Sequence, residues 1–311
     1  MGNTCYLSAL MQCLASVTPE GLSRPRAGSH PLLLLLVQAI DNLLTDDTTP
    51  LHMESLWQEL ARRQPSIAGP LQQDLFECWH HLAVLAPLQG LISISKKLLT
   101  RCGLGAEGCG FSAESIDRTF VWSIPLPPEG SAHGDWWDGA LCDQLTQVHP
   151  LPTWHCPCCG NIGATQRVTD LSVPPCLWLQ VHRFEVGPRG PRKLHQPIPI
   201  PRRSLQLAPL RHGAPLPPVR YHLVGVVLHH GEFAGGHYRA LALRQHTWFC
   251  FDDSLTTCLG AAIPPNLEHL VYGLLLRQSL PQLGGIGAPG SPGLAPSELL
   301  ADPPSPSSGC D

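Results

Sequence analysis

Residues 225–255, GVVLHHGEFAGGHYRALALRQHTWFCFDDSL, place two largely apolar runs on either side of a glycine-rich turn. This pattern predicts two strands of a hairpin. His237 follows the turn directly, and Asp252 and Asp253 lie on the next predicted strand. A histidine that acts as a base needs an acceptor on its second ring nitrogen. We therefore expect His237 to lie within reach of one of these carboxylates.

The glycines of the turn indicate a path for a bound chain. Gly235 and Gly236 leave the backbone bare beside His237, so that a substrate chain can pass close by. The competing interpretation is a polar hairpin with an exposed histidine. The chain has 16 histidines, so the choice depends on whether a nucleophile accompanies this one.

A cysteine near the amino terminus is the candidate nucleophile. In GNTCYLSALMQCL, residues 2–14, Cys5 stands where a Gly-Asn turn enters a helix predicted over 5–17. A helix amino terminus carries partial positive charge and favours the thiolate, which is the reactive form of cysteine. The competing interpretation is a buried structural cysteine.

A second group of cysteines has metal-ligand spacing. Cys156 and Cys159 form a C-x-x-C pair, and Cys102 and Cys109 lie upstream with six residues between them. Two such pairs suit a tetrahedral zinc site with four thiolate ligands. Cys158 competes for a place in this set, and four unliganded reduced cysteines are the alternative.

The order of the predicted elements indicates an α+β fold. Further helices are expected over 32–44, 51–63 and 72–85, and strand-like runs follow at 119–125, 176–184 and 221–229. Helices first and strands later favour α+β over a doubly wound sheet. Residues 279–311 are dense in Pro, Gly and Ser, which predicts a disordered tail.

Composition and cysteine usage limit the partners and the compartment. The formal net charge of −4 argues against a nucleic-acid-binding protein, which would normally show a basic face. The apolar run 32–37 is too short to cross a membrane. The start has no basic signal-peptide region, and 13 cysteines cannot all pair within one chain. We therefore expect neither nucleic acid nor membrane as a partner, and a cytoplasmic and/or nuclear location.

Four ordered motifs together resemble the ubiquitin-specific protease family over residues 1 to about 278. Its cysteine box ends in G-N-T-C-Y, as residues 2–6 do. Its His box runs Y-x-L-x-G-V-x-x-H-x-G, then G-H-Y, then W-x-x-F-D-D-S, and residues 221–254 fit each part. Between the boxes, QQDLFEC at 72–78 and LWLQVHRF at 177–184 are similar to its Q-Q-D-A-x-E-F and L-x-L-x-L-x-R-F.

The resemblance implies a role for each candidate residue. Cys5 would be the nucleophile, His237 the general base and Asp252 the third member of the triad, with Asp253 assisting. Ubiquitin's tail would pass Gly235, Gly236 and Tyr238. The zinc ligands would be the fingertip cysteines Cys102, Cys109, Cys156 and Cys159.

The implied fold is a papain-like α+β protease with a helical thumb over about 1–90 and fingers and palm over 91–278. The implied activity is hydrolysis of the isopeptide or peptide bond after the C-terminal glycine of ubiquitin. In the family an asparagine five residues before the cysteine helps to stabilise the oxyanion, and that position would precede Met1. A weakened or inactive ubiquitin-binding pseudoenzyme therefore stays an alternative.

Overall fold

The computed structural model describes residues 4–17, 30–45, 51–68, 72–86, 88–104, 108–132, 134, 136–188, 190–202, 204–232 and 235–279. The predicted tail, apart from Ser279, lies outside these ranges, as do Gly2 and Asn3 of the cysteine box. All the described elements belong to one unit, Met1–Ser279.

The first part of the chain is helical, as predicted. Its helices are α1 (Cys5–Leu14), α2 (Pro31–Leu44), α3 (Leu51–Arg63), η1 (Pro65–Ala68), α4 (Leu75–Leu85) and α5 (Gln89–Ile92). Helix α4 begins three residues later than the apolar spacing predicted. The reason is Asp74, whose side chain accepts hydrogen bonds from the backbone N–H groups of Phe76 and Glu77 at 2.8 and 3.1 Å. Such an N-cap sets the residue at which the helix begins.

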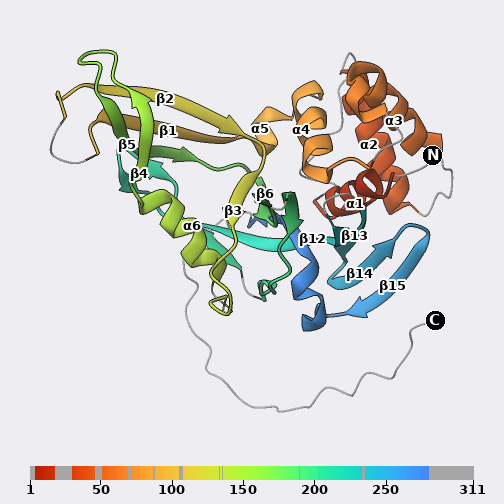
Figure 1. Ribbon diagram of the computed structural model, residues 1–311. Helices are drawn as coiled ribbons and strands as arrows, with labels where there is room; N and C mark the ends of the chain where they lie inside the picture. Colours follow the sequence, from red (N-terminus) through yellow and green to blue (C-terminus); the bar gives the residue numbers. More distant parts are fainter. Residues whose placement is uncertain are drawn as a thin grey trace, which may run out of the picture. The chain divides into compact units, whose positions relative to one another are not determined.

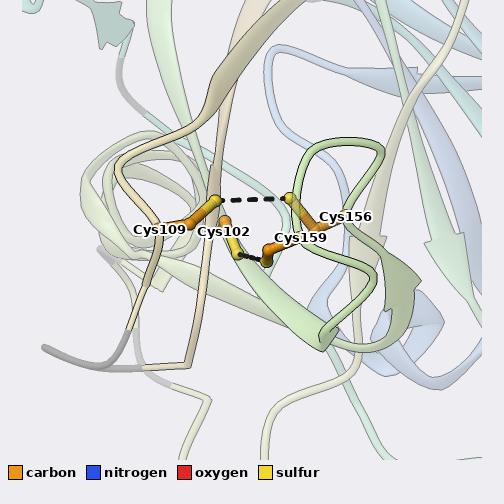
Figure 2. A group of neighbouring side chains, drawn as sticks. All are labelled: Cys102, Cys109, Cys156 and Cys159. Atoms are coloured by element: carbon orange, nitrogen blue, oxygen red, sulfur yellow. Dashed lines mark hydrogen bonds between the residues drawn. The ribbon is translucent and has the colours of Figure 1, made fainter.

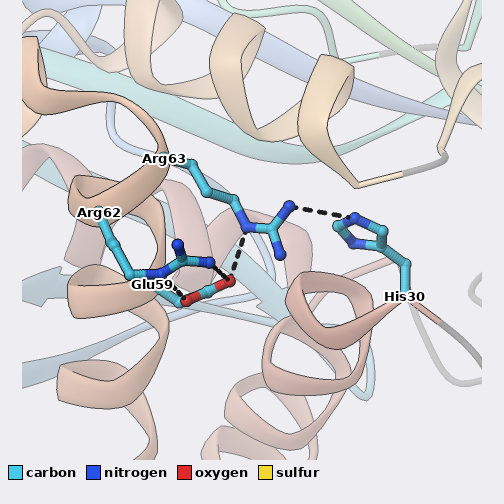
Figure 3. A network of polar contacts seen from close by, with 4 residues as sticks. All are labelled: His30, Glu59, Arg62 and Arg63. Carbon is cyan, nitrogen blue, oxygen red and sulfur yellow. Dashed lines mark hydrogen bonds and ion pairs between the residues drawn. The ribbon is translucent and has the colours of Figure 1, made fainter.

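A polar network joins α3 to the start of α2 (Figure 3). The guanidinium groups of Arg62 and Arg63 bind the carboxylate of Glu59 at 2.8 and 2.6 Å. Arg63 also reaches the ring of His30, the residue before α2, at 3.3 Å. Exposed ion pairs of this kind contribute at most about 1 kcal/mol each, so apolar packing holds these helices together.

One antiparallel sheet extends away from the helices α1 to α4 (Figure 1). Its strands follow the order β11-β10-β5-β1-β2, and β4 also pairs with β5. Most side chains of β2 are exposed, so this sheet has little core of its own. The strands are β1 (Ile94–Cys102), β2 (Ser112–Thr119), β4 (His149–His155), β5 (Ile162–Ser172), β10 (Leu210–Arg211) and β11 (Ala214–Pro215).

A second, eight-stranded sheet forms the centre of the fold. Its order is β15-β14-β13-β12-β16-β6-β3, with β9 also on β12. Strands β3 and β6 run parallel, and the other pairs run antiparallel. The strands are β3 (Trp122–Pro125), β6 (Cys176–His182), β9 (Leu205–Leu207), β12 (Val219–Glu232), β13 (Gly235–Arg244), β14 (Thr247–Asp252), β15 (Leu255–Gly260) and β16 (Val271–Gln278). A separate hairpin joins β7 (Phe184–Gly187) to β8 (Gly190–Lys193).

Helices cover both faces of the central sheet. Buried side chains of α1 to α4 pack on one face, and those of α6 (Trp136–Thr146) and η2 (Pro265–Leu270) belong to the core on the other. The prediction of an α+β fold is confirmed. The sequence pattern missed α6, although Trp137, Leu141 and Leu145 recur at helical spacing and are buried. Among the described residues no helix is both long and apolar enough to cross a membrane.

Helix α1 packs closely on β12 and β13. A side-chain carbon added at Gly225 of β12 would lie 3.1 Å from both Cβ and Sγ of Cys13, so glycine allows the close approach. Arg244 of β13 donates to the carbonyl of Gln12 at 2.7 Å and to the hydroxyl of Ser16. These bonds satisfy acceptors at the end of the helix, where a positive charge is favourable.

Candidate active site and cysteine cluster

Cys5 is the first residue of α1. The preceding Thr4 makes no side-chain capping bond, and its carbonyl accepts the N–H groups of Leu7 and Ser8 at 3.0 Å. The Cys5 side chain is 9% exposed and shares an apolar cluster with Tyr238 and other residues of β13. The helix that begins with Cys5 therefore lies against the strand that carries His237.

His237 forms its hydrogen bond with Asp252. The Nε2 atom of His237 lies 2.6 Å from Oδ1 of Asp252, at the end of β14. The nearest oxygen of Asp253 is 4.0 Å away, and that side chain is 65% exposed. Asp253 has a left-handed backbone with φ of 49°, which turns the chain after β14. The structure thus brings both predicted carboxylates to His237 but gives the hydrogen bond to Asp252.

The segment before α4 holds the backbone on one side of His237. The side-chain amide of Gln72 donates to the carbonyl of Gly236 and accepts its N–H at 2.5 Å. The prediction of site residues did not include Gln72. Its only signal was the similarity of residues 72–78 to a family motif, because nothing local indicates a partner 164 residues away.

The same segment holds Tyr238, on the other side of His237. Asp74 accepts hydrogen bonds from the hydroxyls of Tyr238 and Tyr272 at 3.0 and 2.5 Å. Burial, and then the nearby Asp74 carboxylate, raises the pKa of both tyrosines, so the hydroxyls stay protonated donors. The predicted substrate-binding residue Tyr238 is itself 6% exposed. The residues on both sides of His237, Gly236 and Tyr238, are therefore held by the segment that precedes α4.

The space beside Gly236 is occupied by a buried histidine. A side-chain carbon at Gly236 would collide with the ring of His229 and the carbonyl of His230, whereas one at Gly235 would meet nothing closer than Gln72 at 3.7 Å. Burial lowers the pKa of His229 to about 3, so this ring is neutral at physiological pH. Glycine at 236 thus has an internal packing reason, besides the open path expected from the sequence.

The cysteine cluster lies in the sheet that contains β1 and β5, at the end where β1 finishes with Cys102. The sulfur atoms of Cys102, Cys109, Cys156 and Cys159 all lie within 4.8 Å of one another (Figure 2). The Sγ–Sγ distances are 3.7 Å for Cys102 and Cys159 and 3.6 Å for Cys109 and Cys156. Four thiolates about 2.3 Å from one tetrahedral zinc would lie about 3.8 Å apart. The donor set fits a zinc ion, and Cys159, rather than the neighbouring Cys158, completes it.

The two adjacent glycines give a matched test of this packing. Gly236→Ala should lower the free energy of unfolding by roughly 1–3 kcal/mol, because its methyl group overlaps the ring of His229 and the carbonyl of His230. Gly235→Ala should change it by less than about 0.5 kcal/mol, since its methyl group only contacts Gln72. Urea denaturation of both variants measures the difference. Equal effects would contradict the role assigned to His229.

Comparisons with known proteins agree with this geometry. The family model described as "Ubiquitin carboxyl-terminal hydrolase" matches residues 1–263. The chain is similar to "Probable ubiquitin carboxyl-terminal hydrolase 4" of Schizosaccharomyces pombe, with 30% identity over 122 residues, covering 38% of this chain and 20% of the relative. It is also similar to "Ubiquitin carboxyl-terminal hydrolase 15" of Homo sapiens, with 33% identity over 104 residues, covering 32% of this chain and 11% of that protein.

These matches therefore span a fifth or less of the relatives' own length. Among solved structures, the Ubp8/Sgf11/Sus1/Sgf73 module of SAGA bound to ubiquitin aldehyde contains a chain of the same fold. That match has a TM-score of 0.68 at 21% identity and covers 90% of this chain and 68% of the other. The expected papain-like fold of a ubiquitin-specific protease is thereby confirmed. The chain belongs to the ubiquitin carboxyl-terminal hydrolase family, as its resemblance to the ubiquitin-specific proteases indicated.

Proposed function

We propose that this chain hydrolyses the isopeptide or peptide bond after the C-terminal glycine of ubiquitin. The observation that carries the proposal is the 2.6 Å hydrogen bond between His237 and Asp252, on a hairpin against which the helix of Cys5 packs. Ubiquitin as the partner is supported by two similar structures of Ubp8 modules, one bound to ubiquitin aldehyde and one to monoubiquitin.

Each residue of the proposed triad has one task. Because Nε2 of His237 donates to Asp252, Nδ1 is the nitrogen that takes the proton of the Cys5 thiol. The thiolate attacks the carbonyl carbon of the terminal glycine, and His237 returns the proton to the departing amine. Water, activated by His237, then cleaves the thioester and releases ubiquitin. Asp252 holds the ring and stabilises its charged form throughout.

The remaining assignments follow the same proposal. The helices up to about residue 90 form the thumb, and residues 91–278 form the fingers and palm. The tail of ubiquitin passes Gly235, Gly236 and Tyr238 beside His237. Cytoplasmic and/or nuclear location stays a prediction from the cysteine usage.

We further propose that the cysteine cluster holds a structural zinc ion. Its four ligands would be Cys102, Cys109, Cys156 and Cys159, joining the end of β1 and the β1–β2 connection to the turn between β4 and β5. When bound, zinc would cross-link two segments of a sheet that has little core, and it takes no part in the hydrolysis.

The proposal is tested with a ubiquitin probe that carries a thiol-reactive C-terminal group, together with a fluorogenic ubiquitin substrate. We expect the probe to label Cys5 and the substrate to be hydrolysed, and Cys5→Ser to abolish both. Peptide mass spectrometry locates the label among the cysteines. Ubiquitin binding without labelling or turnover would instead assign the chain as an inactive ubiquitin-binding protein.

The neighbouring aspartates should differ in importance. Asp252→Asn should lower kcat/KM on the order of 10²–10⁴-fold, because the amide no longer holds the ring as a charged acceptor. Asp253→Asn should lower it by less than about tenfold, since its carboxylate lies 4.0 Å from the ring. Steady-state kinetics with the fluorogenic substrate compare them. A larger loss for Asp253→Asn would move the third triad position to Asp253.

Zinc content separates the cluster from its neighbour. Cys159→Ser should lose bound zinc and unfold at lower urea, because three thiolates hold the ion less tightly. Cys158→Ser should keep about one zinc per chain, since its sulfur lies outside the cluster. Elemental analysis of the purified proteins measures both. Zinc retained by Cys159→Ser and lost by Cys158→Ser would reverse the assignment.

A further inference from the structure

Arg239 lies beside the proposed triad without being one of its members. It stands two residues after His237 on β13, so that both side chains leave the same face of the strand. Ala240 pairs with Phe251 across β13 and β14, which brings Arg239 opposite Asp252. The Nη1 atom of Arg239 lies 3.7 Å from Oδ2 of Asp252. The carboxylate therefore has one oxygen on His237 and the other facing a guanidinium group.

The guanidinium group is itself held from the next strand. Arg239 donates through Nη2 to Nε2 of His230, a residue that pairs with His237 across β12 and β13. Arginine can only donate, so His230 accepts at Nε2 and carries its proton on Nδ1. Burial, and then the charge of Arg239, lowers the pKa of His230, which agrees with a neutral ring. His230, Arg239, Asp252 and His237 thus form one chain of contacts over three adjacent strands.

The contact between Arg239 and Asp252 is partly exposed to solvent. The side chains of Arg239 and Asp252 are 20% and 35% exposed, and their distance of 3.7 Å is long for a direct hydrogen bond. Solvent weakens such a pair, so its contribution to stability is small. The pair has a larger effect on the orientation of the Asp252 carboxylate, because Asp252 ends β14 just before the left-handed residue Asp253. Contacts to both oxygens, Oδ1 with His237 and Oδ2 with Arg239, limit the directions in which this carboxylate can point.

We propose that Arg239 is a positioning residue of the hydrolase, which holds Asp252 so that Oδ1 stays on Nε2 of His237. The inference rests on the proposed function, because it assigns Arg239 to the same triad. Arg239 acts on the reaction only through Asp252 and touches no reacting atom.

A double-mutant cycle tests this assignment. Arg239→Gln keeps a donor for His230 but removes the charge that faces Asp252, and it should lower kcat roughly tenfold with little change in KM. Arg239→Lys, which keeps the charge, should recover most of the loss. In the Asp252→Asn background, Arg239→Gln should lower kcat by less than about twofold further. Arg220→Gln, at an exposed position of β12, serves as the control and should leave kcat within about twofold.

A tenfold loss that persists in the Asp252→Asn background, or a failure of Arg239→Lys to restore activity, would overturn the assignment. The same cycle is read a second time from the rate at which iodoacetamide alkylates Cys5, followed by mass spectrometry. This reaction needs no ubiquitin, so it reports on Arg239 even if the chain does not cleave ubiquitin. Absence of ubiquitin hydrolysis together with the expected alkylation cycle would refute the proposed function alone.

Discussion

The contact between α1 and β13 is the constraint on which the site depends. Cys5 and His237 are far apart in the sequence, and the packing of α1 on β13 brings their elements together. Two features keep the helix close to the sheet, namely the missing side chain at Gly225 and the hydrogen bonds from Arg244 to the end of α1. Arg244 is partly buried, and hydrogen bonds from a charged donor are worth about 1.5–3 kcal/mol. The contacts that pack α1 on the sheet therefore also place Cys5 near the strand of His237.

A second layer of contacts fixes the base after the helix has been placed. The short segment from Gln72 to Asp74 bonds to the residues on both sides of His237, and it also starts α4. One acidic side chain thus caps a helix and holds two tyrosine hydroxyls. The contacts in this segment are hydrogen bonds of neutral or singly charged groups with defined directions. They orient the turn more than they stabilise the whole fold, in the manner of a preorganised site.

Much of the chain could be predicted from local pattern. The apolar spacing located α1, α2 and α3, and the apolar runs on either side of the glycine-rich turn located β12 and β13. The pattern failed at α6, where Trp137, Leu141 and Leu145 stand among glycine and polar residues within a β-rich region. It also extended the last predicted helix of the thumb back to residue 72, because apolar periodicity cannot see the cap that Asp74 provides. Periodicity reports which face is buried, not where hydrogen bonding to a side chain ends an element.

The sequence by itself determined the kind of chemistry: a cysteine at a helix start, a histidine after a glycine-rich turn, two candidate carboxylates and two cysteine pairs. Only the tertiary structure decided which alternatives are used. It gave the hydrogen bond of His237 to Asp252 and the fourth place in the cysteine cluster to Cys159. The reason is that adjacent residues are nearly equivalent in a sequence pattern, whereas their side chains point in different directions. Strand register and the turn at Asp253 set those directions, and both arise from contacts between distant segments.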